Sequence, residues 1–582
     1  MTQAKTTGSG AAGKAPASAA STGKISVMTL AIMNIVAVVS LRGLPAEAEY
    51  GLSSIFYYVF AAIVFLIPVS LVAAEMAAAW PQKGGVYRWV GEAFGTRLGF
   101  LAIWLLWIES TIWFPTVLTF AAVSLAFIGP SQTWDTALSA NKWYVFVVCL
   151  VVYWGATLVN LRGMSAGARL SKWGGLIGTI VPAAILIIFG IVWLLTGHPS
   201  QMPIAAKDLF PDLTKINNLV LASSIFLFYA GMEMSAVHVK DIDNPTKNYP
   251  KAIFLASGAT VAIFVLGTLA IGFVVPQQQI NLTQSLLVAY DDFFKAFGLG
   301  FLSPVIAIML AIGVLAGVST WIAGPSKGLL AVGQSGFLPP FMQKTNKAGI
   351  QVNILLIQGV LVTLLTLLFV VLPSVQAVYQ ILSQLTVMLY LIMYMLMFAA
   401  GIWLRVREPN QPRPYRIPGG KIGMFIIAGV GFAGAVLAYV LSFFPPGQIA
   451  VGSTTTWIAM LAAGNIFFVV LPFIIYALRK PHWKTAQGEA AMEPFGWEKP
   501  AAPAPGKAKA TAAGKSAKPA SKRTKNDGKP TYCCGHPVCT RRSPHPIQGR
   551  AGWGQRLLYP GAGASAVKPF RYCGRNRGRP GL

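Results

Sequence analysis

Charged residues are scarce in this chain of 582 residues. Asp, Glu, Lys and Arg together make up only 11% of the sequence, whereas a soluble globular protein contains about 25%. Hydrophobic residues make up 55%, and apolar runs of about 20 residues recur along most of the chain. This pattern excludes an ordinary soluble domain and is typical of an all-α membrane protein with many spanning helices.

Acidic residues are rarer still, with 18 Asp and Glu against 46 Lys and Arg, so the formal net charge is +28. A basic charge spread over the whole chain would favour nucleic acid as a partner. However, residues 479–582 contain 21 of the 46 basic residues and only four acids. The excess is concentrated in a C-terminal tail, so the sequence argues against nucleic acid, and the tail could instead contact anionic lipid.

Signatures of enzymes and of metal sites are missing from the sequence. There is no G-x-x-x-x-G-K-S/T loop that would cradle a nucleotide phosphate. Of the five Cys, Cys149 lies alone in an apolar segment, and the other four lie after residue 530 with a spacing that fits no standard zinc site. We therefore expect no enzyme activity, no catalytic residues, no cofactor and no metal.

The composition divides the chain into three parts. Residues 1–24 are rich in small and polar residues without an apolar core, and they are predicted to be a disordered cytoplasmic arm. Residues 25–480 hold the apolar segments and form the predicted transmembrane domain of 12 helices. Residues 481–582 are predicted to be a basic, largely disordered cytoplasmic tail.

The twelve spans are predicted from the apolar segments. They lie near 25–49, 52–74, 98–128, 143–160, 174–195, 217–239, 252–275, 302–325, 352–372, 377–404, 422–442 and 456–478. The loops on one side of the membrane carry 17 Lys and Arg, against four on the other side. Because basic loops stay in the cytoplasm, both termini are predicted to be cytoplasmic.

Two predicted spans contain residues that interrupt a helix. The first span contains Ser40-Leu-Arg-Gly-Leu-Pro45, and the sixth contains Tyr229-Ala-Gly-Met-Glu233. Because they lie five spans apart, they enter the membrane from opposite sides, which is typical of a five-plus-five inverted repeat with broken helices 1 and 6, here followed by two C-terminal helices. Alternatively, the features are an ordinary proline kink and a small residue for close helix packing. The matching positions favour a binding site.

Unpaired backbone at the two breaks predicts the class of substrate. Free N–H groups bind a carboxylate and free carbonyls bind an ammonium group, and a free amino acid carries both on one carbon. The candidate substrate-binding residues are Ser40, Leu41, Arg42 and Gly43 at the first break, and Tyr229, Gly231, Met232 and Glu233 at the second.

Ionisable residues at membrane depth are costly and therefore point to function. Arg42 could bind a carboxylate with its planar fork, or it could pair with an acid such as Glu109 or Glu233, or extend to the membrane surface. Glu233 could sense acidity, exchange a proton, hold an ammonium group or pair with Arg42. Glu233 and Glu109 are thus the candidates for proton or charge coupling.

Aromatic residues at helical spacing include Trp321 and the pair Tyr390 and Tyr394. Such residues more often serve packing or the membrane interface than binding. Their spacing alone therefore favours a structural interpretation.

Several blocks of sequence occur in an order that is found in a known superfamily. They include Ile67-Pro-Val-Ser-Leu-Val-Ala-Ala-Glu-Met76, Gly84-Gly-Val-Tyr-Arg-Trp89, Tyr229-Ala-Gly-Met-Glu-Met-Ser235, Ser319-Thr-Trp-Ile-Ala-Gly-Pro-Ser-Lys327 and Tyr415-Arg-Ile-Pro-Gly-Gly420. From about residue 25 to 480 the chain resembles the amino acid–polyamine–organocation superfamily, and most closely its bacterial glutamate/γ-aminobutyrate antiporters.

The resemblance implies alternating-access exchange of amino acids in a bacterial inner membrane. In such acid-resistance systems, external glutamate is traded for its decarboxylation product. The resemblance also implies that Glu233, Trp321, Tyr390 and Tyr394 lie on the substrate path.

Two positions depart from the antiporters. Their tyrosine-rich first break is replaced by Arg42-Gly43-Leu44-Pro45, and their acid four residues before the tryptophan of the eighth span is Gly317 here. Losing an acid and gaining an arginine shifts the site toward negative substrates. The exchanged pair therefore stays open, as do a proton- or sodium-coupled symporter of the same fold and a non-transporting receptor or scaffold whose basic tail binds a partner.

Overall fold

The computed structural model describes residues 25–82, 84–163, 173–212, 223–233, 242–445, 453–486, 488 and 492–498. Outside the described residues lie the predicted arm at 1–24, residues 217–222 and 234–239 of the predicted sixth span, and residues 499–582 of the predicted tail. The four Cys of the tail belong to this last part.

Ten helices within the described ranges are long and apolar enough to cross a membrane. They are α3 with η3 and α4 (Gly51–Ala79), α6 (Thr96–Ala126), α8 (Lys142–Leu161), η4 with α10 (Trp173–Leu195), α13 (Pro245–Val274), α15 (Gly300–Gln334 with the preceding η9), α16 with α17 (Val352–Val371), α18 (Val375–Arg407), α19 (Gly420–Leu441) and α20 (Thr454–Ala477). A bent pair, formed by α1 (Val27–Val38) and by η1 with α2 (Leu41–Ala48), passes the same test when its two parts are taken together, and it makes an eleventh span if the pair is one broken span.

The predicted all-α polytopic membrane fold is therefore confirmed. Of the sixth span the described part contains only α12 (Ser224–Phe228) and the residues up to Glu233. The count of twelve helices consequently stays a prediction. Three further helices fall in predicted loops: α5 (Val86–Phe94), α7 (Gln132–Ser139) and α14 (Ser285–Ala296).

The eighth span is longer than predicted. The sequence indicated an end at residue 325, but α15 continues through Pro325 to Gln334. A proline usually ends a helix because it lacks an N–H group and crowds the preceding turn. Within a membrane bundle, contacts with neighbouring helices allow a helix to continue past a proline.

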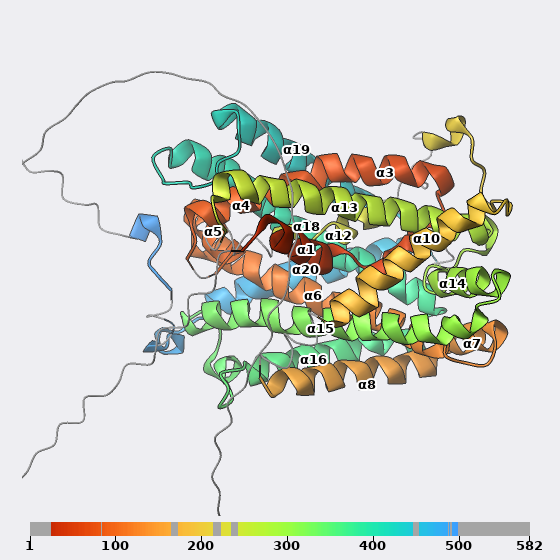
Figure 1. The fold of residues 1–582 in the computed structure, drawn as a ribbon. Helices are drawn as coiled ribbons and strands as arrows, with labels where there is room; N and C mark the ends of the chain where they lie inside the picture. The colour runs from red at the N-terminus through yellow and green to blue at the C-terminus, as the bar shows by residue number, and fades with distance from the viewer. Residues whose placement is uncertain are drawn as a thin grey trace, which may run out of the picture. The chain divides into compact units, whose positions relative to one another are not determined.

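The spans differ in how far they are enclosed by their neighbours. Of the most apolar stretch of each, 94% is buried in α6 and 72% in α18, but only 22% in α20. In Figure 1 the helices α8, α15 and α16 run side by side, and the short α1 and α12 lie among the long helices. The helices α6 and α18 thus form the core, beside the two short helices.

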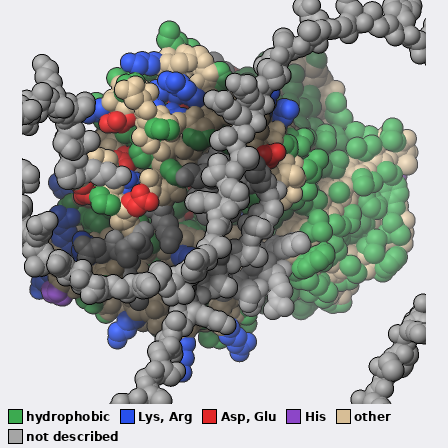
Figure 2. Space-filling view, turned by 60° about the vertical axis from the view of Figure 1, so that its left-hand side comes forward, with side chains coloured by type: hydrophobic (Ala, Val, Ile, Leu, Met, Phe, Trp, Pro, Cys, Tyr) green, Lys and Arg blue, Asp and Glu red, His purple; other side chains and the backbone are tan. Residues whose placement is uncertain are grey.

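The outer faces of the long helices are apolar, which fits lipid. Figure 2 shows a broad apolar surface on one side of the molecule, with most of the visible Lys and Arg side chains on the other side. Exposed apolar side chains occur on the outer helices, among them Val151 of α8, Leu364 of α16 and Ile466 of α20. Such a surface would be unfavourable in water and is expected in hydrocarbon.

The helices η4 (Leu176–Ile180) and α15 approach each other to backbone contact. A Cβ atom added to Gly178 would lie 2.2 Å from the nitrogen of Gly313, and one added to Gly313 would lie 2.4 Å from the carbonyl oxygen of Gly178. Small residues of this kind allow membrane helices to pack closely. The contact fixes one wall of the site described below.

The first residues of the predicted tail are packed against α5. Arg88 donates to the backbone carbonyl of Glu493 at 2.6 Å and lies over the ring of Phe495 at 4.7 Å. The N–H of Gly496 donates to Glu92 at 2.9 Å. Of the predicted tail, the structure thus describes residues 481–486, 488 and 492–498.

A buried ion network joins α4 (Ile67–Ala79) to α18 and to the loop after it. One oxygen of Glu75 pairs with Arg405 and, at 3.2 Å, with Arg413. The other oxygen accepts the backbone N–H of Ile417 at 2.7 Å. Both partners of the Glu75–Arg405 pair are at most 1% exposed at their side chains, so breaking the pair leaves an uncompensated buried charge.

We predict that Glu75→Ala lowers the stability of the purified protein by about 3–5 kcal/mol, because two buried arginines lose their counter-ion. The midpoint of thermal unfolding in detergent measures this effect. The matched control is Glu493→Ala, whose exposed side chain is replaced while its backbone contact with Arg88 remains. Equal midpoints for the two variants would contradict a structural role of the network.

Candidate substrate-binding site

The first break separates α1 from η1 and α2. The two helical parts are bent by 45°, and Ser40 between them is extended, with φ −134°. Pro45 lacks an N–H group and so cannot complete a continuous helix through this point. Gly43 permits close packing, because a Cβ atom there would lie 2.3 Å from the ring of Phe228. The predicted interruption at 40–45 is therefore present, and it contacts α12 directly.

The second break follows the end of α12. Gly231 has φ +108°, a backbone conformation that L-residues with side chains rarely adopt. Its N–H donates to the Tyr394 hydroxyl at 2.9 Å and to Glu233 Oε2 at 3.2 Å. Side chains thus replace the helical hydrogen bond that the break removes, as a membrane interior requires.

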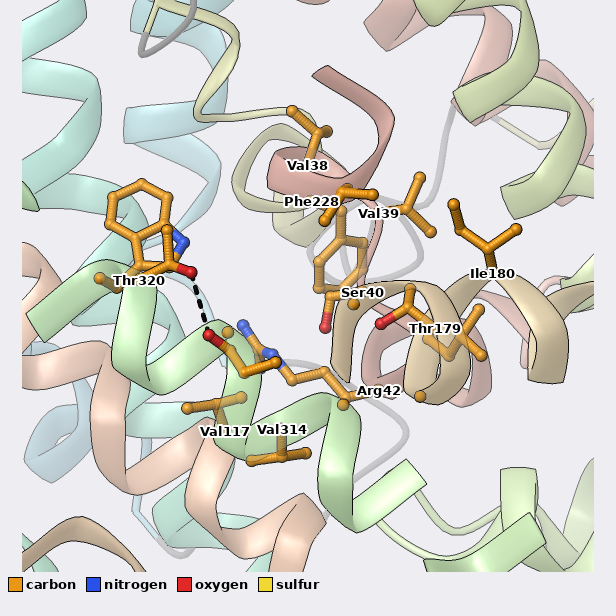
Figure 3. Close-up of a pocket in the computed structure, with 18 of the residues that line it drawn as sticks. Val38, Val39, Ser40, Arg42, Val117, Thr179, Ile180, Phe228, Val314 and Thr320 are labelled. Atoms are coloured by element: carbon orange, nitrogen blue, oxygen red, sulfur yellow. Dashed lines mark hydrogen bonds between the residues drawn. The ribbon is translucent and has the colours of Figure 1, made fainter. Parts of the chain in front are cut away.

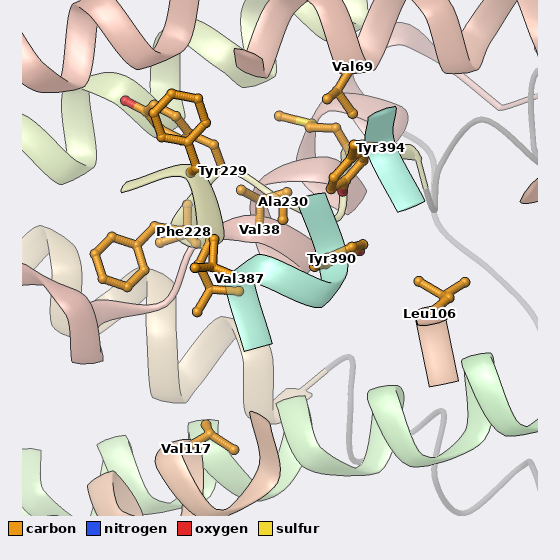
Figure 4. Packing of buried hydrophobic residues seen from close by; sticks show 14 of the residues in the cluster. Val38, Val69, Leu106, Val117, Phe228, Tyr229, Ala230, Val387, Tyr390 and Tyr394 are labelled. Carbon is orange, nitrogen blue, oxygen red and sulfur yellow. The ribbon is translucent and has the colours of Figure 1, made fainter. Parts of the chain in front are cut away.

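Glu233 holds the second break against α18. Its two oxygens accept the hydroxyls of Tyr390 and Tyr394, each at 2.5 Å. The two rings are stacked with centroids 4.6 Å apart, and Figure 4 shows Tyr390 and Tyr394 beside the chain at Phe228–Ala230. No ion pair joins Glu233 to Arg42 within the described ranges. This hydrogen bonding could not be derived from the sequence.

A cavity of about 800 Å³ lies beside the two breaks, a volume within the range of about 300–1,000 Å³ that is usual for ligand pockets. Of the predicted residues, those that line it are Ser40, Leu41, Arg42, Glu109, Trp321 and Tyr390. It extends along α1 and η4, where Ile32, Met33, Gly175 and Thr179 contribute to its walls. The cavity thus runs from the first break along the walls formed by α1 and η4.

The other predicted residues do not line the cavity. Gly43, Gly231, Met232, Glu233 and Tyr394 shape the breaks and their contacts instead. Tyr229 is fully buried, and its hydroxyl donates to the carbonyl of Tyr58 at 3.1 Å. The structure therefore separates the predicted set into residues that face the cavity and residues that hold the broken backbone.

Arg42 places a positive charge on the cavity wall. Its guanidinium group donates to the Tyr379 hydroxyl at 3.0 Å and lies 5.5 Å from the ring centre of Trp113 and 6.0 Å from that of Phe228. Aromatic faces attract a cation without neutralising it. No acid among the described residues lies within ion-pair distance of Arg42, and its Nε atom has no partner there. Figure 3 shows the side chain extending toward Thr320.

Glu109 places an acid on the same wall. It is 2% exposed, and its Oε1 atom has no hydrogen-bond partner in the described part of the chain. Trp113 and Val117 follow at steps of four residues and also line the cavity, because such residues share one face of α6. That spacing could have indicated Trp113 from the sequence, whereas nothing in the sequence pointed to Tyr379.

Two interrupted spans beside a cavity are typical of a secondary membrane transporter. The chain belongs to the amino acid permease family, whose profile matches residues 25–471. It is 41% identical over 450 residues to an uncharacterized transporter of Legionella pneumophila, covering 77% of this chain and 96% of that protein. It is 33% identical over 460 residues to the glutamate/γ-aminobutyrate antiporter of Lactococcus lactis, covering 78% of this chain and 90% of that protein.

A relative with another name is more distant. The chain is 22% identical over 457 residues to the aspartate/glutamate permease of Lactococcus lactis, covering 73% of this chain and 90% of that protein. The crystal structure of MhsT in complex with L-phenylalanine aligns with a TM-score of 0.48 at 15% identity, covering 71% of this chain and 98% of that one.

We predict that Gly231→Ala slows transport, because a side chain at φ +108° is strained by about 1–3 kcal/mol and would shift the break. Uptake of labelled substrate into proteoliposomes, measured beside the thermal midpoint, tests this. Gly155→Ala is the matched control, since its added Cβ meets nothing within 4 Å in the regular helix α8. Equal uptake by both variants would show that the break tolerates a regular backbone.

Proposed function

We propose that the protein is an amino acid antiporter that exchanges glutamate for γ-aminobutyrate or a related pair. The observation that carries the proposal is Arg42, which is 3% exposed and lines the cavity without an acidic partner among the described residues. A cation at such a site is expected to recruit an anion. The name of the Lactococcus relative supports glutamate as that anion.

The two charged groups on the wall suit the two ends of an acidic amino acid. Arg42 would bind one carboxylate through its planar fork, which matches two carboxylate oxygens. Glu109, with an unpaired oxygen in the described structure, would accept the ammonium group. The exposed backbone around Ser40 would bind the remaining polar atoms.

The cavity also supports alternating access. It extends from the first break along α1 and η4, toward the N-terminal end of the first span. On the other side of the break, Leu44, Ala46 and Ala48 are at most 3% exposed, and the chain there is enclosed by its neighbours. With both termini in the cytoplasm, the cavity would face the inside of a bacterial inner membrane, and the basic tail would lie near anionic lipid.

We predict that proteoliposomes containing the purified protein take up labelled glutamate when loaded with unlabelled γ-aminobutyrate or glutamate, and that empty ones do not. Exchange requires a substrate for the return step, whereas symport does not. Equal uptake by loaded and empty vesicles would contradict exchange and favour a proton- or sodium-coupled symporter of the same fold.

We predict that Arg42→Lys weakens the binding of acidic amino acids more than that of neutral ones, because lysine keeps the positive charge but lacks the planar guanidinium group that pairs with both carboxylate oxygens. Arg42→Ala should lower the affinity for glutamate by about 10–100-fold, which corresponds to the loss of a hydrogen bond to a charged group. Competition of a panel of amino acids against labelled glutamate measures both effects. Unchanged selectivity in both variants would assign Arg42 to structure.

A non-transporting receptor or scaffold makes the opposite prediction. Removal of residues 499–582 would then abolish function, while Arg42→Ala would be silent. Residues 481–498 should be kept in this experiment, because Glu493 and Gly496 contact α5.

A further inference from the structure

Glu47 is a buried acid that neither the sequence analysis nor the proposed exchange uses. It lies in α2, the part of the first span beyond the break, and it is 0% exposed. Its Oε1 atom accepts the hydroxyl of Ser224 at 2.8 Å. Its Oε2 atom has no hydrogen-bond partner among the described residues. The hydroxyl of Ser224 is thus the one hydrogen-bond partner of this carboxyl group among the described residues.

Glu47 lies where three spans meet, which we call the seam of α2, α12 and α18. Ser224 begins α12, and the preceding Ser223 donates to Oε1 of Gln384 on α18 at 3.3 Å. Arg42, just before α2, donates to Tyr379 of α18. The seam therefore closes the side of the first break that the cavity does not reach.

Further polar atoms in the seam lack partners. The Nε2 atoms of Gln380 and Gln384 are buried without a hydrogen bond in the described structure, as is the hydroxyl of Ser383. A permanently closed contact is expected to satisfy such groups, because each one left alone costs about 1–3 kcal/mol. Their presence indicates a contact that opens to water during the cycle.

A charged Glu47 would be unfavourable in the closed seam. No Lys, Arg or His of the described residues is within ion-pair distance, and the cation nearest in sequence, Arg42, donates to Tyr379 instead. An unpaired carboxylate away from water costs far more than its neutral form. The closed seam therefore holds the neutral acid.

The other titratable groups around Glu47 do not supply a positive charge that could pair with its carboxylate. Tyr57 and Tyr58 of α3 (Ser54–Ala61) and Tyr229 after α12 lie near enough to interact with its charge. These phenols are neutral at physiological pH. Of the other helices packed on α2, α13 has no titratable side chain after Lys251.

The remaining charged groups of this region have partners of their own. On α14, Asp291 is paired with Lys295 at 2.5 Å, and Tyr290 donates to the carbonyl of Pro182. Glu49, two residues after Glu47, is a second carboxyl group of this region and is partly exposed. The experiments below must therefore distinguish the protonation of Glu47 from that of Glu49.

We propose that Glu47 is a proton-binding site whose protonation accompanies closure of the seam of α2, α12 and α18. On opening, water reaches the carboxyl group, the O–H bond breaks, and the proton passes to water on that side of the membrane. On closing, the carboxylate takes a proton back from the same water. This inference rests on the proposed transport cycle and deepens it, because it makes the opening step of that cycle depend on the pH on this side while moving no net proton across the membrane.

The direction of the pH effect follows from proton linkage. The closed seam binds one proton more than the open seam, so lower pH favours closure and higher pH favours opening. If the transport rate depends on opening this side, the rate would change by up to about tenfold per pH unit, which is the limit for the binding of one proton. Glutamine at this position removes the proton and keeps the shape.

The first experiment uses the whole protein without substrate. At neutral pH, the infrared C=O band of protonated carboxyl groups should lose intensity in Glu47→Gln relative to the wild type, and should largely persist in Glu49→Gln. Because it needs no transport, this result is independent of the exchange proposal. An unchanged band in Glu47→Gln overturns the inference.

The second experiment measures glutamate exchange in proteoliposomes as the pH on the outer side of the seam is varied. The wild type and Glu49→Gln should show the pH dependence, and Glu47→Gln should vary less than about twofold over the same range, because it has no proton to lose. Retained glutamate binding shows that Glu47→Gln is folded. A pH dependence that disappears in Glu49→Gln and remains in Glu47→Gln assigns the proton to Glu49 and overturns the inference.

Discussion

Every backbone group that a broken helix frees inside the membrane must find another partner, and the site is built on that constraint. At Gly231 the partners are Tyr394 and Glu233. Since Glu233 is itself held by two tyrosine hydroxyls of α18, the second break is stable only while α18 lies against it. Glu233 thus stabilises the interrupted backbone by accepting the N–H group of Gly231.

The charges of the site follow a second constraint, which is the cost of an isolated ion in apolar surroundings. Different residues meet it in different ways. Glu75 has two arginines, and Glu233 has two hydroxyls and an N–H group. Arg42 has one hydroxyl and three aromatic rings, and no acid among the described residues. Arg42 and Glu109 both line the cavity with little local compensation among the described residues, and a charged substrate could complete them there.

The sequence was sufficient for the all-α membrane fold, because length and apolarity alone determine spanning helices. It also indicated both breaks, since Pro45 and Gly231 act locally on the backbone. It could not say which of the predicted residues face the cavity, because that depends on contacts between distant helices, such as Arg42 with Tyr379. Glu47 was missed although it is five residues from Arg42 and at membrane depth. The rule that flagged Glu109 would also have flagged Glu47.

The tyrosine pair on α18 has a mechanical consequence. Tyr390 and Tyr394 are one helical turn apart and grip both oxygens of a single carboxylate at 2.5 Å. A sliding motion of the second break along α18 would have to break both bonds at once, whereas a rotation of the two together would break neither. Among the described residues, the first break is joined to α18 by the Arg42–Tyr379 hydrogen bond. The two breaks are therefore held to α18 unequally. The second break is fixed to α18 by two hydrogen bonds to Glu233, whereas the first break can rotate about one.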